Sequence, residues 1–74
     1  MQPKTAINLF SKKHPQKKPI GYWAINDGII INTESTDGRI EPAQFMVTNQ
    51  GDMYGVTPIM FGLTPENMTR IKDK

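Results

Sequence analysis

The fold of this chain is decided by residues 20–31, which read IGYWAINDGIII. Aromatic and β-branched residues, which favour extended strands, stand on both sides of the Asn-Asp-Gly segment at residues 26–28. Residues of these three types suit the tight turn that joins two antiparallel strands. The stretch therefore predicts a β-hairpin, with one strand over residues 20–25 and the next from Ile29 onward.

Toward the C-terminus, the sequence predicts a second hairpin after a polar loop. Residues 33–38 form the expected exposed loop, and the return that follows it is interrupted by Pro42. Strands are predicted at residues 44–48 and 53–57, joined by the turn-forming segment Asn-Gln-Gly-Asp and ended or edged by Pro58. The two hairpins together give about four strands.

A short helix is predicted ahead of the first hairpin, over residues 5–13. Apolar and long side chains recur there at intervals of three or four, which matches one side of a helix. The residues that share this side are Ala6, Leu9, Phe10 and Lys13. The helix should end before Pro15, because the residue that precedes a proline is kept out of the α region.

A second helix is predicted near the C-terminal end, over residues 64–72. Thr64 suits the N-cap position and Pro65 suits the first helical position. Glu66 then lies at the positive end of the helix dipole, where a carboxylate is favourable. The predicted order of elements is therefore helix, two hairpins, helix.

The length of 74 residues predicts a single α+β domain. The expected architecture is a small antiparallel sheet of about four strands, with the N-terminal and C-terminal helices packed on one face or at its ends. A small SH3-like or OB-like, partly open barrel is the alternative. Both folds need the two hairpins, so the sequence does not separate them.

Charge divides the chain into a basic arm over residues 1–19 and a compact body over residues 20–74. Every ionisable side chain in residues 1–24 is basic or neutral, and every carboxylate side chain lies at or beyond Asp27. The run KKHPQKKP at residues 12–19 predicts a stiff, extended linker within the arm. Segregated charge of this kind lets one part contact phosphate or an acidic surface while the other part folds.

The side chains that most metal, cofactor and catalytic sites require are missing. The sequence has no cysteine and a single histidine, His14, which we expect to be solvated, so it cannot supply the ligands of a structural zinc site. The loop over residues 32–44 lacks the closing glutamate of an EF-hand, and no Gly-rich phosphate cradle is present. We therefore expect no metal, no cofactor and no enzymatic activity.

The functional candidates are the lysines of the arm and the two aromatic rings that follow it. Lysines bind phosphate as flexible point charges, and rings beside a cationic track stack on the bases of single-stranded nucleic acids. Alternation places the two rings on opposite faces of their strand, so at least one is expected in the core. The candidate residues for binding nucleic acid or an acidic partner are Lys4, Lys12, Lys13, Lys17, Lys18, Tyr22 and Trp23.

Two functions from different classes follow from these candidates. In the first, a small non-catalytic protein binds DNA or RNA through its basic arm with low specificity, because arginine, which reads base edges, is scarce. In the alternative, the chain is a modulator or inhibitor of a host or partner protein with an acidic surface. Its size and composition resemble those of small accessory proteins of phages and mobile elements. A third interpretation is that the arm has no binding role and is only a solvated linker.

The remaining expectations concern location, oligomeric state and the methionines. No apolar segment approaches the ~20 residues of a membrane span, and no signal peptide is apparent, so a cytoplasmic protein without a membrane partner is expected. An exposed edge strand beside Pro42 or Pro58 would support a homodimer, although the same prolines can protect an edge. The methionines suit an irregular core or, less favoured, an adaptable interface. They are Met46, Met53, Met60 and Met68.

Overall fold

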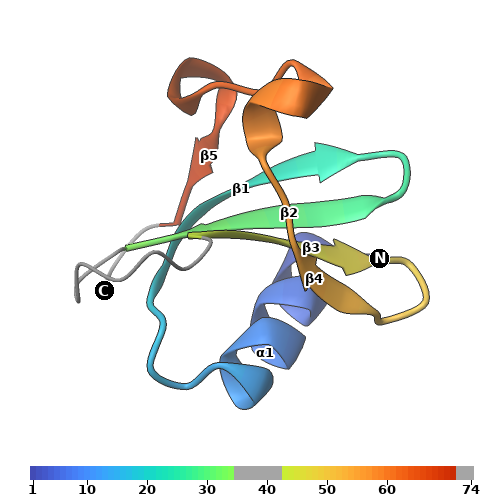
Figure 1. Ribbon diagram of the computed structural model, residues 1–74. Coiled ribbons are helices and arrows are strands. Elements are labelled where there is room, and N and C mark those ends of the chain that lie inside the picture. Colours follow the sequence, from blue (N-terminus) through green and yellow to red (C-terminus); the bar gives the residue numbers. More distant parts are fainter. Residues whose placement is uncertain (35–42, 72–74) are drawn as a thin grey trace.

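The computed structural model of this protein describes residues 1–34 and 43–71 (Figure 1). Within these ranges it contains one α-helix, five strands and two short 3₁₀ turns. They are, in chain order, α1 (Pro3–Lys13), β1 (Pro19–Ile25), β2 (Gly28–Thr33), β3 (Gln44–Thr48), β4 (Met53–Gly55), η1 (Pro58–Phe61), η2 (Pro65–Asn67) and β5 (Thr69–Arg70). The predicted return ahead of Pro42 and most of the predicted polar loop lie outside the described residues.

The five strands form one antiparallel sheet in the order β4-β3-β2-β1-β5 (Figure 1). β1 and β2 form the predicted first hairpin, with Trp23 opposite Ile30. β3 and β4 form the predicted second hairpin, although β4 ends at Gly55 and is shorter than expected. The α+β class is confirmed, and the sheet is open at β4 and β5 instead of closing into a barrel.

The predicted C-terminal helix is wrong, and the sheet has one strand more than the four expected. Helical geometry is confined to η2, and at Met68 the backbone becomes extended, with φ −78° and ψ 136°. Beyond it, β5 pairs with the outer edge of β1, and the Ile71 N–H donates to the Ile20 carbonyl at 3.0 Å. An isolated helix of about nine residues is marginal in water, so pairing with a sheet edge outweighs the local helix signals.

β2 lies at the centre of the sheet and is buried on both of its faces. Ile29 and Ile31 belong to an apolar cluster on the α1 side, whereas Ile30 belongs to a second cluster on the opposite side. All three side chains are buried. Successive side chains of a strand point to opposite faces, so three buried isoleucines in a row require a cover on each face.

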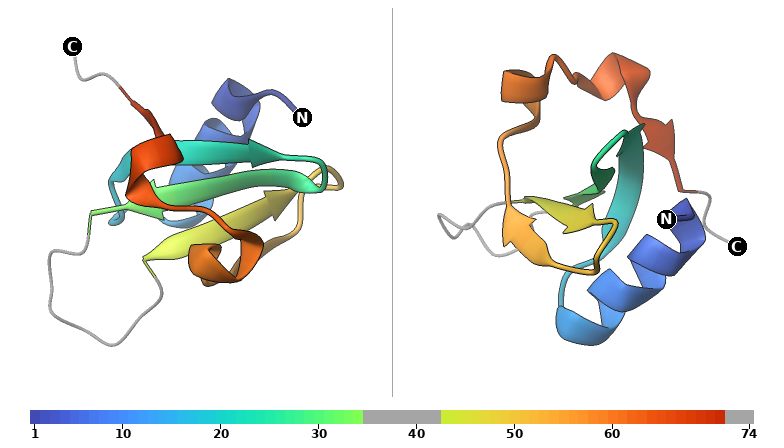
Figure 2. Two further views of the ribbon diagram at one scale, coloured as in Figure 1. Left: turned by 90° about the horizontal axis from the view of Figure 1, so that it is seen from above. Right: turned by 90° about the vertical axis from the view of Figure 1, so that its right-hand side faces the viewer.

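α1 covers the first face of the sheet (Figure 2). The N-terminal helix is confirmed, and it begins at Pro3, where the missing N–H of proline costs no helical hydrogen bond. Ala6 and Phe10, one helical turn apart, are fully buried, and the Phe10 ring centroid lies 5.3 Å from that of Phe45. The buried residues of this cluster are Ala6, Phe10, Ile29, Ile31, Phe45 and Val47. The helix therefore contributes two side chains to the core.

Residues 56–68, which we call the arch, cover the second face (Figures 1 and 2). The arch leaves β4 at one edge of the sheet and joins β5 at the other edge, so it crosses the face that α1 leaves open. The buried residues beneath it are Trp23, Ile30 and Met46, and the arch residues that pack on them are Val56, Leu63 and Met68. The sheet is thus held between a helix and a segment that is mostly irregular.

We predict that Phe10→Ala lowers the free energy of unfolding by about 3–5 kcal/mol, because it removes a fully buried ring from the α1 cluster. For so small a domain, this loss leaves little or no folded protein. The measurement is urea denaturation followed by circular dichroism. Leu9→Ala, on the same helix at a side chain that is 36% exposed, is the matched control and should cost about 1 kcal/mol. Equally small losses in both variants would show that α1 is not part of the core.

Candidate nucleic-acid interface

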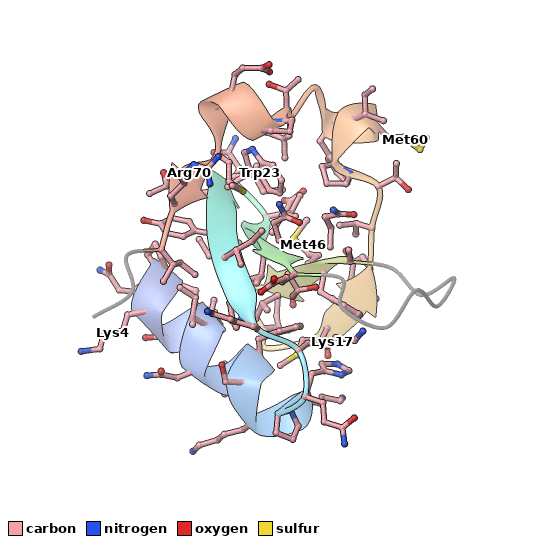
Figure 3. All side chains as sticks on the ribbon, turned by 90° about the vertical axis from the view of Figure 1, so that its left-hand side faces the viewer. Lys4, Lys17, Trp23, Met46, Met60 and Arg70 are labelled. Carbon is pink, nitrogen blue, oxygen red and sulfur yellow. The ribbon has the colours of Figure 1, made fainter. Side chains whose placement is uncertain are left out.

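The basic residues predicted to bind a partner lie on α1 and in the connection that follows it, and we call them together the lysine face: Lys4, Lys12, Lys13, Lys17 and Lys18. On α1, Lys4, Asn8 and Lys12 are exposed and follow one another at intervals of four, so they form one stripe along the helix. The helical rise places Lys4 and Lys12 about 12 Å apart along the axis. Figure 3 shows Lys4 pointing away from the sheet, opposite to the side that Phe10 buries.

Lys17 and Lys18 lie in the connection between α1 and β1. The Lys17 N–H donates to the His14 carbonyl at 3.1 Å, which closes a turn with Pro15 at its second position. The Lys18 carbonyl accepts a hydrogen bond from the Glu34 N–H at 2.9 Å, which ties the connection to the end of β2. The predicted extended linker is therefore wrong, because the chain must reverse between α1 and β1 and proline favours that turn position.

His14 is half-buried and not the solvated side chain that the sequence suggested. Its ring stacks on Phe45, with centroids 5.0 Å apart and an interplanar angle of 28°, and it lies 5.1 Å from the Phe10 ring. The Lys17 Nζ lies 5.7 Å from the centroid of the Phe45 ring, within the range of a cation–π contact. The rings at the C-terminal end of α1 therefore pack on one another and on Lys17.

Tyr22 and Trp23 lie on opposite faces of β1, as the alternation predicted, and Trp23 is in the core. Tyr22 is half-buried against the α1 cluster, on the same side of the sheet as the lysine face. Trp23 is 5% exposed beneath the arch, where its Nε1 donates to the Thr64 carbonyl and to Asn67 Oδ1, both at 3.0 Å. The fold thus places Tyr22 on the α1 side of the sheet and Trp23 on the opposite side.

The lysine face contains no carboxylate from its own segment. Residues 1–26 contain five lysines and no aspartate or glutamate. Asp27 and Asp52 are exposed next to the two hairpin turns, which is where the sequence predicted turn residues. In residues 1–34 and 43–71, no group of three or more His, Cys, Asp or Glu side chains could hold a metal ion.

A second surface, which the sequence did not reveal, consists of Ile59, Met60 and Phe61 of η1, and we call it the apolar ridge. These side chains are 73%, 83% and 48% exposed. The expectation that Met60 fills the core is wrong, whereas Met46 is buried as expected. Residues 53–65 contain no charged side chain, so the ridge stands in a neutral stretch. A short apolar run between proline and glycine resembles a core segment, which is why no sequence signal distinguished it.

The lysine face and the apolar ridge lie on opposite sides of the sheet. Figure 3 shows Lys4 on the α1 side and Met60 on the arch, pointing away from it. A single flat partner therefore cannot contact both surfaces at once. Helices that lie on membranes combine basic and apolar residues in one surface, and this molecule keeps them apart.

Comparison with known proteins gives no relative of this chain. No protein-family model, no curated protein and no solved structure matches it. In the described part of the chain, the helical segments fall short of the length and apolarity needed to cross a membrane. The lysine face and the apolar ridge are therefore the two features from which a function can be inferred.

We predict that Asn67→Ala loosens the arch, because the Asn67 Oδ1 accepts hydrogen bonds from both Trp23 Nε1 and the Thr64 N–H. The expected cost is about 1–2 kcal/mol of unfolding free energy, with easier acrylamide quenching of Trp23. Asn67→Asp keeps an acceptor oxygen and is the matched control, which should retain both the stability and the protected emission. If the two variants lost the same stability, the acceptor role of this side chain would be refuted.

Proposed function

We propose that this protein is a non-catalytic nucleic-acid-binding protein that contacts phosphates through the lysine face. The observation that carries the proposal is the exposed stripe of Lys4, Asn8 and Lys12 on a helix whose other side is buried in the core. Because the helix is docked, the positions from which the lysines extend are set before the partner arrives. Preorganisation of this kind reduces the entropy lost on binding.

The electrostatics of the lysine face support a phosphate partner. All of its lysines come from residues 1–26, which contain no aspartate or glutamate. If all five engaged duplex DNA, roughly four or five counterions would be released, and the binding constant would fall by as many decades for each decade of salt. This type of binding is strong at low salt and weak near physiological ionic strength.

Low sequence specificity is part of the proposal. Bidentate contacts from arginine are the commonest way to read guanine in the major groove. In the described residues the one arginine is Arg70, on β5, and Figure 3 shows it away from α1. Lysine contacts to phosphate position a protein on nucleic acid without reading its sequence.

We predict that combining Lys4→Gln, Lys12→Gln and Lys13→Gln lowers the affinity for a DNA duplex of about 20 base pairs by about 100-fold or more at ~0.1 M salt. The slope of log K against log salt should decrease in magnitude by about three. Glutamine has a helix propensity close to that of lysine, so the fold should persist. Fluorescence anisotropy across a salt series measures both quantities.

The control for this experiment is Arg70→Gln, which removes one exposed positive charge from the other side of the molecule. This variant should bind the duplex almost as the parent does. Unchanged affinity in the triple lysine variant, or an equal loss per charge in the arginine variant, would refute the lysine face as the binding surface.

A second candidate function is favoured by the apolar ridge. Exposed apolar patches on a small protein commonly mark interaction sites, and a few well-anchored side chains supply most of the energy of an interface. Ile59 and Met60 are the two most exposed large apolar side chains of the described residues. They favour docking on an apolar pocket of a partner protein, which this chain would modulate or inhibit.

We predict that Ile59→Ser combined with Met60→Ser leaves the unfolding free energy within about 0.5 kcal/mol of the parent, because both side chains are exposed. The same variant should lose any partner protein that the parent captures from a cell extract, while its affinity for duplex DNA stays unchanged. The triple lysine variant should show the opposite pattern. Retention of the captured protein by the ridge variant would refute this second function.

A further inference from the structure

We infer that the lysine face binds duplex DNA, with the outer side of α1 against the major groove, in preference to single strands and to duplex RNA. This inference rests on the proposed function, because it names the class of nucleic acid that the same surface binds. It is drawn from three features of the structure: where the aromatic rings are, how the helix is shaped, and how the two kinds of DNA differ in charge density.

The first feature is that the aromatic rings on the α1 side of the sheet are buried or half-buried. Proteins that hold single strands combine a cationic track with exposed rings on which bases stack. Phe10, the aromatic residue of α1, is fully buried, and His14 packs on Phe45. Trp23 is enclosed beneath the arch by two hydrogen bonds. Tyr22, one of the two candidate stacking rings in the sequence, is half-buried against the α1 cluster.

The exposed rings of the described residues lie on the other side of the sheet. Phe61 is 48% exposed on the arch. Tyr54 is 51% exposed on β4, directly opposite Met46 in the sheet, and Met46 belongs to the cluster beneath the arch. A nucleic-acid strand that follows the lysines along α1 therefore meets no exposed ring.

The second feature is the convex shape of the lysine face. Lys4 and Lys12 extend from the outside of a helix, and the residues between them on this side, Thr5 and Asn8, are short and uncharged. An α-helix with its side chains is about 10–12 Å across, and the major groove of B-form DNA is about 12 Å wide. Long lysines at both ends of a slim middle allow the helix to enter this groove while the ammonium groups reach phosphates. The major groove of A-form RNA is too narrow for such an approach.

The third feature is a comparison of magnitudes. Each phosphate contact contributes a salt slope of about 0.9 on duplex DNA and about 0.7 on a single strand, so five contacts favour the duplex by about tenfold at ~0.1 M salt. One base stacked on a ring contributes about 5- to 150-fold to the affinity for a single strand. A single available ring would therefore offset the duplex preference. The burial of the rings near the lysines decides in favour of the duplex.

The experiment compares three fluorescein-labelled probes of about 20 nucleotides per strand by anisotropy at ~0.1 M salt: duplex DNA, oligo-dT and duplex RNA. The parent protein should bind duplex DNA at least about tenfold more tightly than the other two probes. Tyr22→Leu, with its folding checked by circular dichroism, should bind oligo-dT as the parent does, within about twofold.

The outcomes separate this inference from the proposed function. Oligo-dT or duplex RNA bound as tightly as duplex DNA would overturn the inference while leaving phosphate binding by the lysine face intact. A large loss of oligo-dT binding in Tyr22→Leu would overturn it as well, because that ring would then be stacking. If none of the three probes bound, both the inference and the proposed function would be refuted.

Discussion

The structure depends on one constraint, the burial of three consecutive isoleucines in the central strand. Ile29 and Ile31 point to one face of the sheet and Ile30 to the other. A sheet with an apolar side chain on each face is stable only when both faces are covered, and the described residues include one long helix with which to do so. α1 covers the first face, and the arch, tied to Trp23 by hydrogen bonds, covers the second.

This constraint arranges the surfaces that are available for function. Phe10 must point into the sheet, so Lys4 and Lys12, on the other side of α1, point outward from a convex surface. The arch must span the second face from one sheet edge to the other. Its first turn, η1, leaves the side chains of the apolar ridge exposed to solvent. The same packing buries or half-buries the aromatic rings on the α1 side of the sheet. The preference for duplex DNA that we propose therefore follows from the packing of the core.

The sequence predicted those parts of the fold that are set by local interactions. The first hairpin and the N-terminal helix follow from turn residues and periodicity within a few positions. The C-terminal segment does not, because its helix signals hold for the single turn of η2 and the edge of β1 determines the rest. The candidate site divides in the same way. The lysines were evident in the sequence, whereas the burial of His14 and the exposure of Met60 depend on how distant segments pack.

We expect α1 and the sheet to unfold as one cooperative unit, and native-state amide hydrogen exchange can show whether they do. The helical amides from Ala6 to Lys13 should exchange as slowly as the most protected amides of β2, because both are released by the same global opening. If the α1 amides exchanged at nearly the rate of an unfolded chain while β2 stayed protected, the helix would be a loose basic arm. The positions of the lysines would then not be fixed, and the account would be contradicted.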